Sequence, residues 1–162
     1  MSEQELMSLL ESLGIHYVRF THPAVFTCEE AVEKCPPMPG RKSKNLFLRD
    51  KNGKRYFLVL TTYEKKVNIR ELEEKLQVKG LGFASPERLK SVLNVSPGSV
   101  GFLSLANDVE KKTAVHIDED LLLASHISSH PSTNTSTLCV QVSDLQKFFA
   151  HTGHTWAGIR LS

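Results

Sequence analysis

The sequence has few of the features that mark secreted, membrane or disulfide-stabilised proteins. It contains three cysteines, an odd number without a CxxC spacing, so we expect free thiols in a reducing compartment. No stretch approaches the roughly 18 apolar residues that a membrane span needs, and Glu3 and Glu5 stand where a signal peptide would carry lysines. These absences predict a cytoplasmic protein.

The chain also lacks a charge bias and the common catalytic signatures. Its 20 Lys and Arg against 18 Asp and Glu give a net charge of +2, so any nucleic-acid binding must depend on local clusters. There is no GxSxG, Walker loop or GxGxxG. The histidine pairs 126/130 and 151/154 have suggestive spacings, but Ile127 replaces the glutamate of HExxH and Pro131 disfavours a helix. We therefore predict no metal and no cofactor.

The patterns that are present indicate one α+β domain over residues 1–162, with a mainly antiparallel mixed sheet flanked by helices. Asn52-Gly53 between apolar runs predicts a hairpin, and Ser2, Asn68, Ser85 and Ser143 are candidate helix N-caps. The expected helices follow these caps, up to residues 13, 76, 93 and about 153, with shorter ones near 28–34 and 121–124. The expected strands are 15–20, 46–48, 56–60, 83–84, 102–105, 113–117 and 137–142, and the pair 102–105 and 113–117 is expected to form a second hairpin.

A basic loop enters the first strand of the predicted hairpin. Arg41, Lys42 and Lys44 place three cations within four residues, which predicts an anion site with phosphate as the natural ligand. Asn45 adds an amide that can orient a carbonyl or hydroxyl beside the ammonium. The alternative is an ordinary solvated basic loop.

Two further polar segments are candidates for ligand contact. The turn Ser96–Gly101 can present backbone N–H groups to a ligand, because glycine permits a close approach at Gly98. The loop 130–137 carries His130, Asn134 and Thr137. Each segment is also compatible with a plain turn whose side chains cap its own backbone.

Together these segments resemble the free-standing prolyl-tRNA editing proteins, the YbaK/ProX family, which is related to the editing domain of bacterial prolyl-tRNA synthetases. The resemblance runs from about residue 5 to residue 155, and the Lys-Asn-Leu-Phe-Leu block is most similar to the branch that removes alanine from mischarged proline tRNA. Its motifs are His22-Pro23-Ala24-Val25-Phe26-Thr27, Ser43-Lys44-Asn45-Leu46-Phe47-Leu48-Arg49-Asp50, Phe83-Ala84-Ser85-Pro86-Glu87-Arg88-Leu89, Pro97-Gly98-Ser99-Val100, Asn107-Asp108, and His130-Pro131 with Asn134 and Thr137.

The resemblance implies a mixed α/β editing fold and hydrolysis of the ester in mischarged tRNA(Pro), with alanine as the expected amino acid. Attack by water is expected, with prolyl-tRNA synthetase as a further partner. The resemblance assigns Lys44 to contact with the terminal adenosine and phosphate of the tRNA, and Asn45 to contact with the aminoacyl group. It assigns the Gly98 loop to binding of the aminoacyl carbonyl and His130 to ordering of the site. The remaining expected substrate contacts are Val25, Phe26, Thr27, Ser99, Val100, Asn134 and Thr137, and the expected tRNA contacts are Arg41, Lys42 and Lys79, with Lys65 and Lys66 as outlying ones.

The chain departs from the family pattern in the glycine loop. The position four residues after Gly98 is Phe102 instead of proline, and Gly101 precedes it. We expect the loop to be less rigid and Phe102 to narrow the pocket. Two alternatives follow, namely a tRNA-binding module without catalytic activity and an editing enzyme for another amino acid, serine or cysteine.

Overall fold

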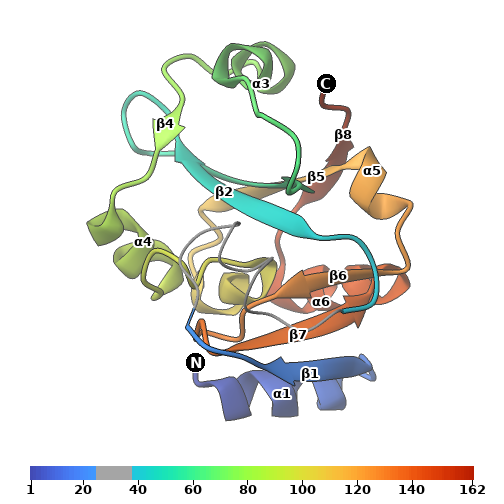
Figure 1. Cartoon of the computed structure of the whole chain (residues 1–162). Coiled ribbons are helices and arrows are strands. Elements are labelled where there is room, and N and C mark those ends of the chain that lie inside the picture. Colours follow the sequence, from blue (N-terminus) through green and yellow to red (C-terminus); the bar gives the residue numbers. More distant parts are fainter. Residues whose placement is uncertain (25–37) are drawn as a thin grey trace.

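Two β-sheets share one core in the computed structural model, which describes residues 1–24 and 38–162. A mixed five-stranded sheet has the order β4-β2-β3-β5-β8, and an antiparallel three-stranded sheet has the order β1-β7-β6 (Figure 1). The strands are β1 (Tyr17–Thr21), β2 (Ser43–Arg49), β3 (Tyr56–Thr62), β4 (Gly82–Phe83), β5 (Thr113–Asp118), β6 (His126–Ser129), β7 (Ser136–Gln141) and β8 (Trp156–Ile159). The predicted α+β class is confirmed, with two sheets in place of one.

Three helices, α1 (Glu3–Ser12), α3 (Ile69–Leu76) and α4 (Pro86–Leu93), begin where their caps predict. Ser2 forms a capping box with Glu5, and the side chains of Asn68 and Ser85 accept amide hydrogens of the helices that follow them. Further helices are α5 (Glu119–Leu122) and α6 (Leu145–Thr152), with the 3₁₀ helices η1 (Phe102–Asn107) and η2 (Val142–Asp144). The helix predicted near 28–34 lies outside the described residues.

The hairpin between β2 and β3 is confirmed. The two strands are antiparallel, with Asn45 opposite Leu60 and Ser43 opposite Thr62. At the turn, the Asp50 carboxylate accepts the backbone N–H groups of Lys54 and Arg55, which immediately precede β3, and Gly53 adopts a left-handed φ of +67°. This hairpin carries the predicted basic site at the start of β2.

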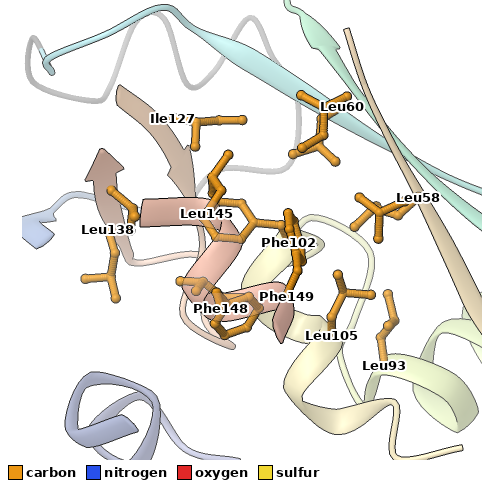
Figure 2. Packing of buried hydrophobic residues seen from close by; sticks show 14 of the residues in the cluster. Leu58, Leu60, Leu93, Phe102, Leu105, Ile127, Leu138, Leu145, Phe148 and Phe149 are labelled. Carbon is orange, nitrogen blue, oxygen red and sulfur yellow. The ribbon is translucent and has the colours of Figure 1, made fainter. Parts of the chain in front are cut away.

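The main core lies between the two sheets and contains side chains of both. Ile127 of β6 and Leu60 of β3 point toward the same interior, where Leu145, Phe148 and Phe149 of α6 also pack (Figure 2). A smaller apolar cluster, including Leu48 and Phe57, covers the opposite face of the five-stranded sheet beneath α3. The centre of the five-stranded sheet is therefore buried on both faces, which accounts for the continuous burial of β3.

Three sequence predictions were wrong. Residues 102–105 form the 3₁₀ helix η1 rather than a strand, because all four side chains are buried and Ser104 N–H turns back to the Gly101 carbonyl at 3.0 Å. The second hairpin is consequently absent, and β5 pairs in parallel with β3 and β8. Ser143 does not cap α6, since it lies inside η2. Strands β6 and β8 had not been predicted.

None of the described helices has the length and apolarity that a membrane span requires.

Candidate functional site

Lys44 and Asn45 lie at the start of β2 on opposite faces of the sheet. Consecutive strand residues alternate, and Asn45 shares its face with Leu60, which belongs to the core between the sheets. Lys44 pairs with Thr61, whose hydroxyl points to the other face and donates to Asp118 at 2.6 Å. The structure therefore separates the ammonium and the amide that the sequence suggested would act side by side.

The ammonium of Lys44 is held at the edge of the sheet. It donates to the backbone carbonyl of Lys65, which is an uncharged acceptor. Strand β4 covers only Leu48 and Arg49 of β2, so the first residues of β2 form a free edge among the described strands. Within the described part of the chain, no carboxylate forms an ion pair with Lys44.

The neighbouring Lys65 is committed to structural ion pairs. Its ammonium lies 2.8 Å from a carboxylate oxygen of Asp118 and 2.8 Å from one of Asp120. Burial alone would raise the pKa of Asp118, but the hydrogen bonds from Lys65 and Thr61 outweigh it and hold that pKa below its usual value. Lys65 is consequently unsuited to the outlying tRNA contact predicted for it, and it fixes the carbonyl that Lys44 binds.

The other predicted tRNA contacts do not form one cluster. Arg41 is exposed and paired with Glu64 at 2.7 Å, and the Lys42 ammonium lies 5.9 Å from the centre of the Tyr63 ring. Lys79 follows α3 at the far end of β2, and seven strand residues span roughly 20 Å. Arg41 and Lys42 remain beside Lys44, whereas Lys79 lies apart from them.

Two histidines from distant parts of the sequence, His22 and His130, lie side by side and form a histidine cluster separate from Lys44. The rings of His22 and His130 are 5.9 Å apart in an edge-on arrangement. His22 Nε2 is 2.8 Å from the Thr137 hydroxyl, and His130 Nδ1 is 2.9 Å from the Ser136 carbonyl. The carbonyl only accepts, so Nδ1 of His130 carries the hydrogen, and burial lowers the pKa of His130, which favours the neutral ring.

Sequence reasoning did not assign a role to His22, Ser129 or Ser136. The repeated His-Pro step, at His22-Pro23 and again at His130-Pro131, was the available signal. Thr137, a predicted substrate contact, lies in this cluster, because its hydroxyl is 2.8 Å from His22 Nε2. Among the described residues, no hydrogen bond or ring contact links the histidine cluster with Lys44 or Asn45.

The glycine loop is anchored against the histidine cluster. A Cβ placed on Gly101 would lie 2.1 Å from the Ser129 hydroxyl and 3.2 Å from the His130 backbone nitrogen. The same hydroxyl accepts the Leu103 N–H at 3.3 Å. The absence of a side chain at Gly101 thus allows a close contact between the loop and Ser129, which holds this end of the loop in place.

Phe102 does not narrow a pocket. Its side chain is fully buried, and its ring contacts Phe148 and Phe149 in the core at centroid distances of 5.9 and 6.4 Å (Figure 2). Earlier in the loop, Gly98 has a left-handed φ of +91°, and the Ser99 N–H donates to the Ser96 carbonyl at 3.0 Å. The amide of Ser99 is thus occupied, and Gly98 and Val100 are the better candidates for binding a carbonyl.

Several predicted substrate contacts are placed neither beside Lys44 nor in the histidine cluster. Val25, Phe26 and Thr27 lie outside the described residues, and Asn134 lies in the half-buried loop between β6 and β7. The search of residues 1–24 and 38–162 finds no group of three or more potential metal ligands. A surface hollow of about 480 Å³ near Leu122 and His126 contains none of the predicted site residues.

Comparison with known proteins shows independently which family this chain is similar to. A model of the aminoacyl-tRNA editing domain matches residues 22–148. The prolyl-tRNA editing protein ProX of Acetoanaerobium sticklandii is 31% identical over 160 residues, covering 99% of this chain and 98% of the relative. Prolyl-tRNA synthetase associated domain-containing protein 1 of Danio rerio is 34% identical over 154 residues, covering 94% and 83%.

Solved structures share the fold. The crystal structure of hypothetical protein APE2540 superposes with a TM-score of 0.72 at 15% identity, covering 97% of this chain and 98% of that one. A structure proposed to be a trans-editing enzyme for prolyl-tRNA synthetase gives 0.68 at 18% identity, covering 99% and 96%. The match of the family model over most of the chain, with full-length relatives above 30% identity, shows that the protein belongs to the aminoacyl-tRNA editing domain family and is an enzyme of the aminoacyl-tRNA deacylase class.

Proposed function

We propose that the protein hydrolyses alanine from mischarged tRNA(Pro) as a trans-editing enzyme in the cytoplasm. The observation that carries the proposal is the packing of Gly101 against Ser129 and the backbone nitrogen of His130, which sets the end of the glycine loop beside the residue whose imidazole is oriented by the Ser136 carbonyl. An ester hydrolase needs a donor for the developing oxyanion and an acceptor for the proton of the attacking group. The relatives' names supply the substrate class, because they refer to prolyl-tRNA editing and to prolyl-tRNA synthetase.

His130 is the proposed proton acceptor. With Nδ1 donating to the Ser136 carbonyl, the neutral ring keeps an acceptor lone pair on Nε2. In this proposal, Nε2 accepts a hydrogen bond from the ribose hydroxyl next to the ester, and that hydroxyl orients the water that attacks the carbonyl carbon. The proton that the water loses passes through that hydroxyl to Nε2, and it returns to the leaving ribose oxygen as the ester C–O bond breaks, which releases free alanine and the tRNA with its terminal hydroxyl restored.

The glycine loop is the proposed oxyanion site. The amides of Gly98 and Val100 are assigned to the aminoacyl carbonyl oxygen, since the Ser99 amide is already bound. A correctly placed donor of this kind lowers the barrier by about 3 to 4 kcal/mol. No covalent nucleophile is required, so positioning and electrostatic stabilisation account for the catalysis.

Lys44 is the proposed contact to the terminal phosphate and adenosine of the tRNA. Its neutral carbonyl partner, its place at an edge of β2 that no described strand covers, and the lack of an ion pair with any described carboxylate leave it able to pair with a phosphate. Arg41 and Lys42 lie beside it and extend this contact along the acceptor end. Lys79, at the other end of β2, is proposed to meet a separate part of the tRNA.

Alanine is the expected amino acid because a synthetase site shaped for proline cannot exclude a smaller residue strongly. One missing methylene changes binding by only about 1 to 3 kcal/mol, so a second, hydrolytic site is needed. Val25 and Phe26 remain the proposed apolar walls of that site, with Thr27 and Asn134 as further contacts. Prolyl-tRNA synthetase is proposed as the source of the mischarged substrate.

The test is deacylation of alanyl-, seryl-, cysteinyl- and prolyl-tRNA(Pro) by the wild type and by Lys44→Ala and His130→Ala. We expect rapid loss of alanyl-tRNA(Pro), survival of prolyl-tRNA(Pro), and at least tenfold slower hydrolysis by both variants. Lys90→Ala, which removes an exposed lysine of α4, is the matched control and should retain the wild-type rate. Tight tRNA binding without hydrolysis of any species would instead establish the binding module, and preferential loss of serine or cysteine would replace alanine.

A further inference from the structure

The loop that carries His130 is bound by the segment that begins α1. The Ser136 hydroxyl, where this loop enters β7, donates to Glu3 Oε1 at 2.9 Å. Ser132, within the loop, donates from its hydroxyl to the Met1 carbonyl, also at 2.9 Å. These contacts join positions 133 and 131 residues apart, so only the tertiary fold brings the two segments together.

The Glu3 carboxylate is itself held in place. The oxygen atom that accepts the Ser136 hydroxyl also lies 2.6 Å from Nε of Arg19 in β1. Hydrogen bonds to an ionised group are shorter and stronger than those between neutral groups. Strand β1 pairs with β7, where Arg19 is opposite Leu138. One carboxylate oxygen therefore links the first turn of α1 to two neighbouring strands.

The backbone of Ser136 shows how this link reaches the imidazole. His22 N–H donates to the Thr135 carbonyl at 3.0 Å, which makes these two residues a hydrogen-bonded pair. The next pair of the antiparallel ladder, Thr21 and Ser136, is then not hydrogen-bonded, so the backbone groups of Ser136 point away from β1. His130 Nδ1 lies 2.9 Å from the carbonyl that is left open in this way. Ser136 thus binds α1 through its side chain and the imidazole through its carbonyl.

Glu3 and the histidine cluster lie on opposite faces of β7. Ser136 shares its face with Leu138, two residues along the strand, which packs in the main core with the leucines of α1. Thr137 points to the other face, where its hydroxyl meets His22. Glu3 is therefore separated from the histidine cluster by the strand, and it acts on His130 only through Ser136.

We propose that Glu3 is a positioning residue for His130, which holds Ser136 so that the Ser136 carbonyl keeps the imidazole hydrogen on Nδ1. This proposal rests on the proposed function and deepens it, because His130 is the proton acceptor proposed above. The hydrogen bond made by one ring nitrogen of a histidine sets the state of the other. When Ser136 is released, the imidazole is free to rotate or to carry its hydrogen on Nε2, and the acceptor lone pair is lost.

The first test is spectroscopic and needs no tRNA. Correlation spectra of the ¹⁵N-labelled His130 ring at neutral pH should show one tautomer in the wild type, with the hydrogen on Nδ1. Glu3→Ala and Ser136→Ala should each show a mixture of the two tautomers, and His130→Gln identifies the signal. Glu11→Ala is the matched control and should keep the wild-type spectrum, because Glu11 also binds β1 from α1, through the Tyr17 hydroxyl at 2.8 Å, but makes no such contact with Ser136.

The second test is the kinetics of alanyl-tRNA(Pro) hydrolysis. Removing the group that orients a metal-bound histidine costs roughly tenfold or more in activity, and we expect a kcat about tenfold lower for Glu3→Ala and for Ser136→Ala. KM should stay within about twofold, because the orientation of His130 changes and the tRNA contacts do not. Glu3→Gln, which keeps an acceptor oxygen for Ser136, should restore most of the wild-type rate. The double variant should be no slower than the slower single variant, because both changes break the same hydrogen bond.

Unchanged tautomers in Glu3→Ala and Ser136→Ala would overturn the proposal. A fall in kcat without a change of tautomer would also overturn it, because that result indicates a general structural role. If Glu3→Ala does not fold, Ser136→Ala decides the question, since it removes only the hydroxyl and keeps the backbone carbonyl. A wild type that does not hydrolyse alanyl-tRNA(Pro) would refute the proposed function, whereas the spectra would still decide whether Glu3 positions His130.

Discussion

Gly101→Ala probes the contact that fixes the glycine loop. The backbone at Gly101 is extended, with a φ of −167°, so any residue can adopt its conformation. The obstacle is steric, because the new Cβ would lie 2.1 Å from Ser129 Oγ and 3.1 Å from Ser129 Cβ. Relief requires the hydroxyl to rotate away, which breaks its hydrogen bond with the Leu103 N–H.

The expected loss of stability has two sources, the broken hydrogen bond and the steric overlap. A buried N–H left without a partner costs about 1 to 3 kcal/mol, and overpacking adds a cost of the same order. We expect Gly101→Ala to lower the free energy of unfolding by about 2 to 6 kcal/mol, the sum of the two costs. Gly158→Ala is the matched control, since its Cβ would find ordinary contacts at 3.4 Å or more and its φ is not left-handed. That control should change stability by less than about 0.5 kcal/mol.

The assay is urea denaturation of the single variants and of Gly101→Ala combined with Ser129→Ala. Ser129→Ala alone should cost about 1 to 2 kcal/mol through the lost hydrogen bond to Leu103. In the double variant the clash with the hydroxyl is gone, so its cost should be at least 1 kcal/mol less than the sum of the two single costs. Additive costs within about 0.5 kcal/mol, or a silent Gly101→Ala, would refute the steric account of the loop.

Three further predictions concern buried titratable groups. Burial raises the pKa of the Cys139 thiol to about 11, so iodoacetamide at pH 8 should leave Cys139 unmodified in the native protein and alkylate it in urea, as peptide mapping would show. Burial opposes ionisation of Asp108, but hydrogen bonds from His154 and from backbone amides hold its pKa below the ordinary value. Asp108→Asn should therefore lower the free energy of unfolding by about 2 to 4 kcal/mol at pH 7. Denaturation curves of the two proteins should show this difference shrinking as the pH falls through the lowered pKa of Asp108. Burial lowers the pKa of His130 in the folded protein, so protonation of this histidine favours the unfolded chain. The stability of the wild type should therefore decline as the pH falls below about 6.5. A His130→Gln variant should show a smaller decline over pH 5 to 7 in the same denaturation experiment.

Local features of this chain could be predicted from the sequence because their causes are local. The capping box of Ser2 and Glu5, the cap at Asn68 and the hairpin at Gly53 each depend on groups within a few residues of one another. The motifs around Lys44 and His130 likewise indicated the family, and the family model that matches residues 22–148 confirms it. For the proposed substrate contacts, the sequence supports hypotheses about their roles, and the structure supplies the surroundings of those that lie in its described part.

Tertiary structure alone decided which residues meet. The hydrogen bond between His22 and Thr137 joins positions 115 residues apart. Strand β5 pairs in parallel with β3 and β8, and neither pairing is made through a short turn between neighbouring segments. Alternation in β2 was predictable, but only the strand partners reveal that Asn45 faces the core between the sheets while Lys44 faces Lys65. The physical reason is that a strand pattern sets the period of its side chains, whereas the surface that each face covers depends on packing with distant segments.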